Sequence, residues 1–215
     1  LCALIRTALS TGSPSTVLLT GAPGVGKSRV LDAMLSTLTE QFGGMRSFRL
    51  RGDPLQRLAP WHGVRQLVEA MADHVPNDVF DELTERLNGP LDPSSNVGER
   101  IELGVERRFA LSACLGEAVH ELTSKQIVAV VIDDAHAMDV ASLEMCNTLL
   151  LRCSEYPLLL VLTGWEPMVE TAANFFSNPQ IIYEELAALD PVSTRQVVDE
   201  LAGDLAAVLP TDILD

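Results

Sequence analysis

The chain has 215 residues, a formal net charge of −15, 47% hydrophobic residues and 21% charged residues. This is ordinary globular usage, which excludes a disordered or coiled-coil chain, and the length allows one sizeable core with at most a small appendage. Asp and Glu outnumber Lys and Arg by 30 to 15. Direct binding to nucleic acid is therefore not expected, because that affinity comes largely from basic side chains that neutralise phosphates.

Cysteine usage and hydropathy indicate a cytoplasmic protein without a membrane partner. No apolar run reaches the roughly 18 to 20 residues that a spanning helix needs, and the start of the chain lacks the features of a signal peptide. The cysteines show no C-x-x-C spacing, so we expect reduced thiols and neither a zinc site nor a disulfide framework: Cys2, Cys114, Cys146 and Cys153.

The N-terminal part of the sequence alternates between helical and strand patterns. Apolar residues at helical spacing predict a helix over residues 1–10, and the run TVLLT predicts a buried strand over residues 16–20. After the turn GAPGVGKS, a helical stripe covers residues 29–41, and alternation predicts a strand over residues 45–51. A strand, a glycine-rich loop and a helix in this order form half of a parallel α/β unit.

The rest of the chain continues this alternation. In chain order we expect helices over 61–74 and 79–87, a loop over 88–98, a helix over 99–122, a strand over 127–132, a helix over 140–153, a strand over 157–163, a helix over 166–176, an edge strand over 181–184, and a helix over 193–201 with Ser193 as its N-cap. Near-continuous apolar strands separated by helices predict a three-layer α/β/α fold with a parallel central sheet.

The strongest motif is GAPGVGKS, which fits G-x-x-x-x-G-K-[ST] between a predicted strand and a predicted helix. Its glycines let backbone N–H groups surround a phosphate, and the following helix N-terminus adds its dipole. Lys27 would reach the β- and γ-phosphates, and the Ser28 hydroxyl would complete a Mg²⁺ shell. The expected ligands are therefore ATP and Mg²⁺, and the expected nucleotide-binding residues are Gly21, Ala22, Pro23, Gly24, Val25, Gly26, Lys27, Ser28 and Arg29.

Acidic residues follow a second apolar strand, at the sheet edge where open α/β sheets place their ligands. Asp133 and Asp134 come directly after IVAVVI. We expect Asp133 to bind Mg²⁺ and Asp134 to polarise an attacking water. Thr163 ends the PLLLVLT strand, where P-loop ATPases of the additional-strand type carry a polar residue that senses the γ-phosphate. Its alternative is an ordinary strand end.

Other polar and aromatic residues are assigned weaker roles. His136 follows Asp133 by three residues and could touch the nucleotide site, but a solvated or capping residue is the commoner case. Trp61 and Trp165 are expected to pack, with stacking on a nucleotide base as the alternative.

Together these segments resemble the AAA-like ATPase module of the STAND class of P-loop ATPases, found in large LuxR-type transcriptional regulators and in some bacterial Ser/Thr kinases and nucleotide cyclases. The resemblance covers about residues 15–202 and rests on VLLTGAPGVGKSRVLDAML, RGDPLQRLAPWHGVRQLVE and, most specifically, VAVVIDDAHAMDVASLEMCNTLL. It implies a regulatory switch in which ATP holds a closed, often oligomerising state and slow hydrolysis resets it.

Two departures from this family bear on activity. Members usually carry an Arg two residues past the position of Thr163, where this chain has Trp165, and the family's base-contacting Gly-Arg box is absent. Two functions therefore stay open: a regulatory ATPase, and a nucleotide-binding interaction platform without effective hydrolysis. A small-molecule kinase is disfavoured, because residues 80–108 offer few arginines for a lid.

The chain begins at Leu1 rather than Met and ends in mid-pattern at Asp215, so we expect a piece of a longer protein. We expect an ATPase core over residues 1–190, lacking its first residues, and the start of a following helical region over residues 191–215. Expected partners besides ATP are effector or sensor domains outside this segment, and further copies of the module through nucleotide-dependent self-association.

Overall fold

The computed structural model describes residues 1–88, 97–165, 176, 181–188, 190 and 192–195, with side chains of residues 97–104 left out. Its elements in chain order are α1 (Cys2–Ser10), β1 (Ser15–Gly21), α2 (Lys27–Gln41), β2 (Met45–Arg51), α3 (His62–Met71), α4 (Asn77–Asn88), α5 (Val97–Thr123), β3 (Ile127–Asp133), the short 3₁₀ helix η1 (Ala135–Ala137), α6 (Val140–Arg152), β4 (Leu158–Gly164) and β5 (Ile181–Leu186).

The strands of the described residues form one parallel sheet in the order β2-β3-β4-β1-β5. Strand β4 lies between β1 and β3, with Val161 opposite Val17 on one side and Val131 on the other. Strands β1 and β4 are buried along their whole length. Continuous burial explains their near-continuous apolar sequences, because a strand covered on both faces has no polar side.

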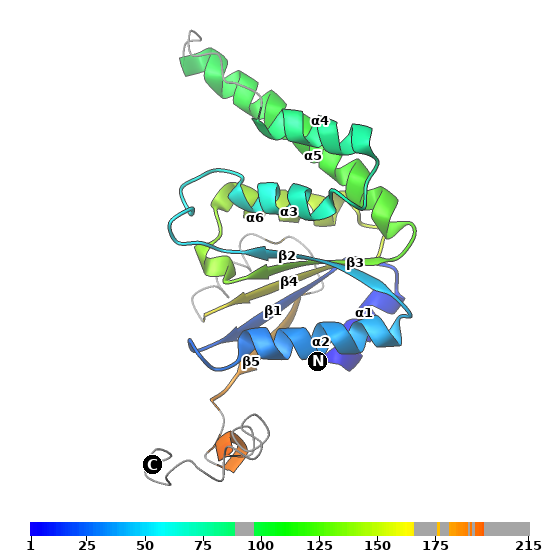
Figure 1. Cartoon of the computed structure of the whole chain (residues 1–215), viewed down its shortest axis with the longest axis vertical. Coiled ribbons are helices and arrows are strands. Elements are labelled where there is room, and N and C mark those ends of the chain that lie inside the picture. The colour runs from blue at the N-terminus through cyan, green and yellow to red at the C-terminus, as the bar shows by residue number, and fades with distance from the viewer. Residues whose placement is uncertain (89–96, 166–175, 177–180, 189, 191, 196–215) are drawn as a thin grey trace.

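Helices cover both faces of this sheet (Figure 1). Helices α1 and α2 pack on one face, and α3, α5 and α6 pack on the other. Each face has its own apolar core, in which the alternating strand residues are shared out: Val17, Val131 and Val161 belong to the first, and Leu18, Ile132 and Leu162 to the second. The predicted three-layer α/β/α fold with a parallel sheet is confirmed.

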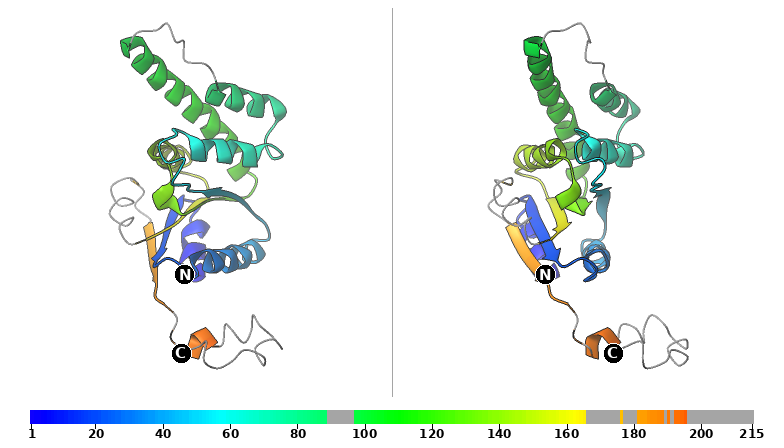
Figure 2. Two further views of the ribbon diagram at one scale, coloured as in Figure 1. Left: turned by 60° about the vertical axis from the view of Figure 1, so that its left-hand side comes forward. Right: turned by 90° about the vertical axis from the view of Figure 1, so that its left-hand side faces the viewer.

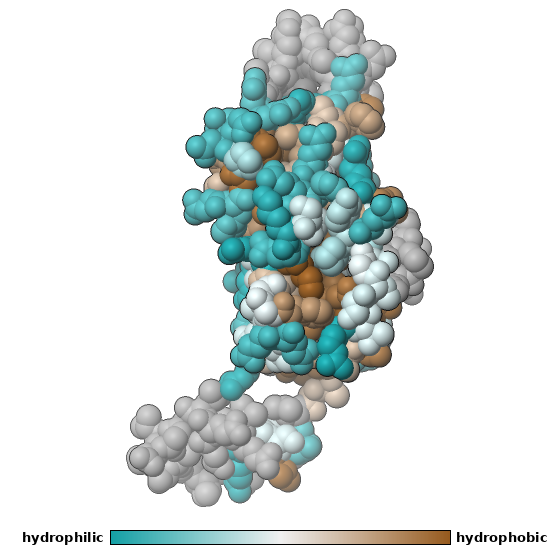
Figure 3. Space-filling view, turned by 90° about the vertical axis from the view of Figure 1, so that its right-hand side faces the viewer, coloured by the Kyte–Doolittle hydropathy of each residue, from teal (hydrophilic) through white to brown (hydrophobic). Residues whose placement is uncertain are grey.

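Helices α4 and α5 pack against each other and extend from the sheet past α3 and α6 (Figures 1 and 2). Hydrophilic residues cover much of the face drawn in Figure 3, with apolar residues gathered near its centre. Among the described helices, none has both the length and the apolar content that a membrane crossing requires.

Most predicted boundaries move by one to three residues, and three differences matter. Helix α2 begins at Lys27, two residues before the prediction, and α5 begins at Val97, inside the predicted 88–98 loop. Ser193 is not an N-cap: its backbone N–H donates to Asp190 Oδ1 at 2.8 Å, so Asp190 fills that role for the helical turn over 192–195. The predicted 166–176 helix lies outside the described residues except for Phe176, which is buried.

Candidate functional site

The GAPGVGKS turn joins the end of β1 to the start of α2. Gly24 and Gly26 have φ of 80° and 98°, in the left-handed region that favours glycine, which explains why this turn is glycine-rich. Gly26 is the N-cap of α2 and makes no side-chain capping bond, so the first N–H groups of the helix are available to an anion.

The Lys27 ammonium lies within this turn. Its Nζ donates to the carbonyl oxygens of Gly21 and Ala22, each at 3.0 Å. These two bonds hold a positive charge against the loop that the motif predicts to receive phosphate. The other predicted nucleotide-binding residues occupy the loop itself, and Arg29 is exposed in the first turn of α2.

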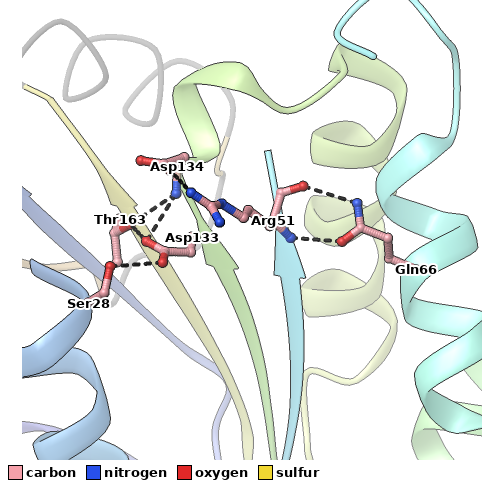
Figure 4. Close-up of polar contacts among 6 residues, drawn as sticks. All are labelled: Ser28, Arg51, Gln66, Asp133, Asp134 and Thr163. Carbon is pink, nitrogen blue, oxygen red and sulfur yellow. Dashed lines mark hydrogen bonds and ion pairs between the residues drawn. The ribbon is translucent and has the colours of Figure 1, made fainter. Parts of the chain in front are cut away.

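Hydrogen bonds join three chain segments in a row along the carboxyl ends of the strands (Figure 4). The Ser28 hydroxyl donates to Asp133 Oδ2 at 2.9 Å, and the Thr163 hydroxyl donates to Asp133 Oδ1. The Asp134 N–H lies 3.1 Å from Thr163 Oγ1 and 3.2 Å from Asp133 Oδ1. The sheet order brings these residues together, because β4 carries Thr163 between β1 and β3.

The Asp133 carboxyl is held in its charged form. Burial acts to raise its pKa, but hydrogen bonds from Thr163, Ser28 and the Asp134 backbone, together with the positive charge of Arg51, outweigh it and lower the pKa. An ionised, hydrogen-bonded carboxylate is the form that binds a metal cation.

Asp134 is placed differently from its neighbour. Its backbone is left-handed, with φ of 53°, and its side chain is 39% exposed. Its Oδ2 lies 3.6 Å from Arg51 Nη2, at the end of β2. The sequence reasoning missed Arg51, although Arg51 ends a predicted strand and the strand-end rule that found Asp133 applies to it as well.

The oxygen pair of Ser28 and Asp133 fits Mg²⁺. The two oxygens are 2.9 Å apart, and Mg²⁺ is commonly bound by one or two protein oxygens together with phosphates and waters. In the described part of the chain, no group of three or more His, Cys, Asp or Glu side chains lies together as a complete metal site. An ion here would therefore need oxygens from the substrate.

A cavity of about 590 Å³ opens beside Asp134, lined by residues that include Arg51, His62 and His136. His136 Nδ1 is buried with no hydrogen-bond partner, and its ring meets the Trp165 ring edge-on at 5.5 Å. His136 and Trp165 thus contact each other next to the carboxylate row. Trp61 instead lies below the Arg107 guanidinium at 5.5 Å and packs against the core.

Comparisons with solved structures support the fold. Drosophila ORC bound to GC-rich DNA and Cdc6 is similar at a TM-score of 0.52 and 14% identity, over 92% of this chain and 30% of that one. C. elegans PCH-2 is similar at a TM-score of 0.49 and 14% identity, over all of this chain and 51% of that one. The chain thus spans about half or less of the length of these neighbours. No curated protein matches the chain.

A protein-family model settles the family. The model of the AAA ATPase domain matches residues 1–162, three quarters of the chain, and this match includes the GAPGVGKS turn and both strand-end aspartates. The chain therefore belongs to the AAA ATPase domain family, whose members are nucleotide-binding modules.

Proposed function

We propose that the chain is an ATP-binding and slowly hydrolysing switch module of a larger regulatory protein. The observation that carries this proposal is the row formed by Ser28, Asp133 and Thr163, beside Lys27 and next to the exposed carboxylate of Asp134. The row provides an ion-binding oxygen pair, a cation for phosphate and a solvent-facing acid within one sheet edge.

Nucleotide binding uses groups that are already in place. The Lys27 ammonium exchanges its two carbonyl partners for phosphate oxygens, and the uncapped N–H groups of α2 donate to the same phosphates. Mg²⁺ held by Ser28 and Asp133 would neutralise charge on the β- and γ-phosphate oxygens.

Hydrolysis requires an oriented water. The Asp134 carboxylate accepts a hydrogen bond from that water and aims its oxygen at the γ-phosphorus, as the bond to the bridging oxygen of the leaving ADP breaks. Thr163, fixed against Asp133, contacts the γ-phosphate on the side of β4.

The regulatory role rests on the resemblance to STAND-type modules. A switch needs γ-phosphate contacts in only one of two states, because a ligand shifts an equilibrium only by its differential affinity. We place the core at residues 1–190 and the start of a helical region at 191–215; the helical turn over 192–195 lies apart from the sheet (Figures 1 and 2). Effector or sensor domains and further copies of the module are the proposed partners. The free thiols fit a reducing compartment such as the cytoplasm.

One observation favours a platform that binds nucleotide without effective hydrolysis. Trp165 stands where the resembling family has an Arg, is 49% exposed, and packs on His136 rather than offering a charge. Without that cation, negative charge developing on the γ-phosphate loses one source of stabilisation.

Phosphate release separates the two functions. We expect measurable release by the wild-type chain with Mg²⁺-ATP, and in Asp134→Asn a loss of at least about 100-fold with ATP affinity unchanged within about twofold. Asp73→Asn, an exposed carboxylate outside the site, is the matched control and should behave as wild type. Wild-type release equal to buffer alongside ATP binding selects the platform, and full activity in Asp134→Asn rejects the role of that residue.

A further inference from the structure

The Gln66 carboxamide holds the backbone at the end of β2 (Figure 4). The Arg51 N–H donates to Gln66 Oε1 at 2.8 Å, and Gln66 Nε2 donates to the Arg51 carbonyl oxygen at 3.0 Å. Within the described sheet β2 is an edge strand, so its outward backbone groups have no strand partner. The carboxamide satisfies both groups of one residue, as a neighbouring strand would.

Helix α3, which carries Gln66, is itself fixed to the segment that follows Asp134. Asp139, only 2% exposed, accepts hydrogen bonds from the N–H groups of Trp61 at 2.8 Å and Gly63 at 3.1 Å at the start of this helix. The Gly52 N–H also donates to the Asp133 carbonyl oxygen at 2.8 Å. The end of β2 is therefore held from the β3 side and from the α3 side.

Only the backbone of Arg51 is held in this way. Its side chain is 78% exposed, and its guanidinium lies 3.6 Å from Asp134 Oδ2. An exposed ion pair at this distance is weak and does not fix its own geometry. The direction from which the guanidinium meets Asp134 is therefore set by the backbone that Gln66 holds.

We infer that Gln66 is a positioning residue for the Asp134 carboxylate, acting through Arg51. This inference rests on the proposed function, because the position of Asp134 matters for turnover only if Asp134 orients the attacking water. Small displacements of such a group lower the rate of the chemical step more than they weaken substrate binding.

A double-mutant cycle tests the inference. Gln66→Met keeps the length of the side chain and removes both hydrogen bonds, and we expect kcat to fall roughly threefold to tenfold with the Kd for a fluorescent ATP analogue unchanged within about twofold. In the Arg51→Ala background the same substitution should change kcat by less than about 1.5-fold, because the guanidinium through which it acts is gone. Glu69→Met, at an exposed position of the same helix, is the matched control and should leave kcat at the wild-type value.

Each outcome decides the matter, with thermal unfolding checked for every variant. An equal fall of kcat in both backgrounds shows that Gln66 only supports the fold, and an unchanged or raised kcat in Gln66→Met overturns the inference as well. If Gln66→Met does not fold, Gln66→Glu replaces it: this side chain accepts from the Arg51 N–H, cannot donate to the carbonyl oxygen, and should show the same dependence on Arg51. Absence of turnover in the wild-type chain would overturn the proposed hydrolysis itself, which distinguishes that failure from a failure of Gln66 alone.

Discussion

Thr16 shows how a single polar atom is accommodated within a fully buried strand. Its side chain lies in β1 with 0% exposure, and its hydroxyl has no hydrogen-bond partner. Four residues later, the Thr20 hydroxyl lies 3.0 Å from the Tyr183 hydroxyl and donates to it. The two threonines therefore have the same chemistry and the same strand, and differ in whether the buried hydroxyl is satisfied.

Thr16→Val should raise the free energy of unfolding by about 1 kcal/mol, because valine keeps the branched shape and removes an unpaired hydroxyl. Thr20→Val is the matched control and should not stabilise, since it leaves the Tyr183 hydroxyl without that donor. Denaturant unfolding measures both variants. A loss of stability in Thr16→Val would show that the hydroxyl is satisfied in solution.

The buried cysteines predict a loss of stability in alkali. Burial raises the pKa of the Cys146 thiol to about 12 and that of Cys153 to about 11. A thiol in the unfolded chain has a pKa near 8.5, so above that pH the unfolded chain releases protons that the folded chain keeps. The free energy of unfolding should therefore fall as pH rises from about 8.5 toward 11.

Comparison with Cys146→Ala isolates one thiol. Its stability deficit relative to wild type should narrow by about 2 kcal/mol between pH 7 and pH 10, as measured by denaturant unfolding at each pH. Cys2→Ala, at a partly buried position, serves as the control for loss of a thiol. An equal deficit at both pH values would contradict the burial of Cys146.

At the scale of elements, one carboxylate joins the starts of two helices. Asp139 accepts from the N–H groups of Trp61 and Gly63 at α3, and from the N–H and hydroxyl of Ser142 at α6, at 2.9 and 2.7 Å. A helix N-terminus leaves N–H groups unsatisfied, and here a single buried side chain satisfies two of them. The arm formed by α4 and α5 joins this junction through Arg107, whose guanidinium lies over the Trp61 ring and donates to the carbonyl oxygen of Leu87.

Asp139→Ala should lower the free energy of unfolding by about 3 kcal/mol, because it removes caps from two helices and leaves their buried donors unpaired. Asp53→Ala is the control: its carboxylate accepts one bond, from the Leu55 N–H at 2.9 Å in an exposed turn, so it should cost well under about 1 kcal/mol. Chemical denaturation measures both. A cost for Asp139→Ala no larger than that for Asp53→Ala would contradict the shared cap.

At the scale of the whole molecule, local motifs predicted what depends on short stretches of chain. The GAPGVGKS turn, the apolar strands and the Asp133–Asp134 pair are each contained within a few residues, and the structure has them in the expected elements. The α2 start was misplaced because Lys27 and Ser28 were assigned to the turn, whereas they already form its first helical residues.

Contacts that depend on strand order could not be predicted in the same way. The pair formed by Arg51 and Asp134 spans more than 80 residues, and it exists because β2 pairs with β3 in register. The Gln66 clamp depends on how α3 lies against the edge of β2, which periodicity does not encode. Asp190, rather than Ser193, caps the last described turn because either residue type can cap, and only geometry decides.

The account as a whole depends on nucleotide binding at the turn that holds Lys27. The most direct measurement is titration of the chain with a fluorescent ATP analogue, with and without Mg²⁺, for wild type, Lys27→Ala and the control Lys125→Ala, an exposed lysine paired with Glu121. Saturable binding that Mg²⁺ strengthens, a Kd raised roughly tenfold to 100-fold in Lys27→Ala, and a wild-type Kd in Lys125→Ala are the expected results. Wild-type affinity in Lys27→Ala, or no binding by the wild-type chain, would contradict the assignment of this turn as the nucleotide site.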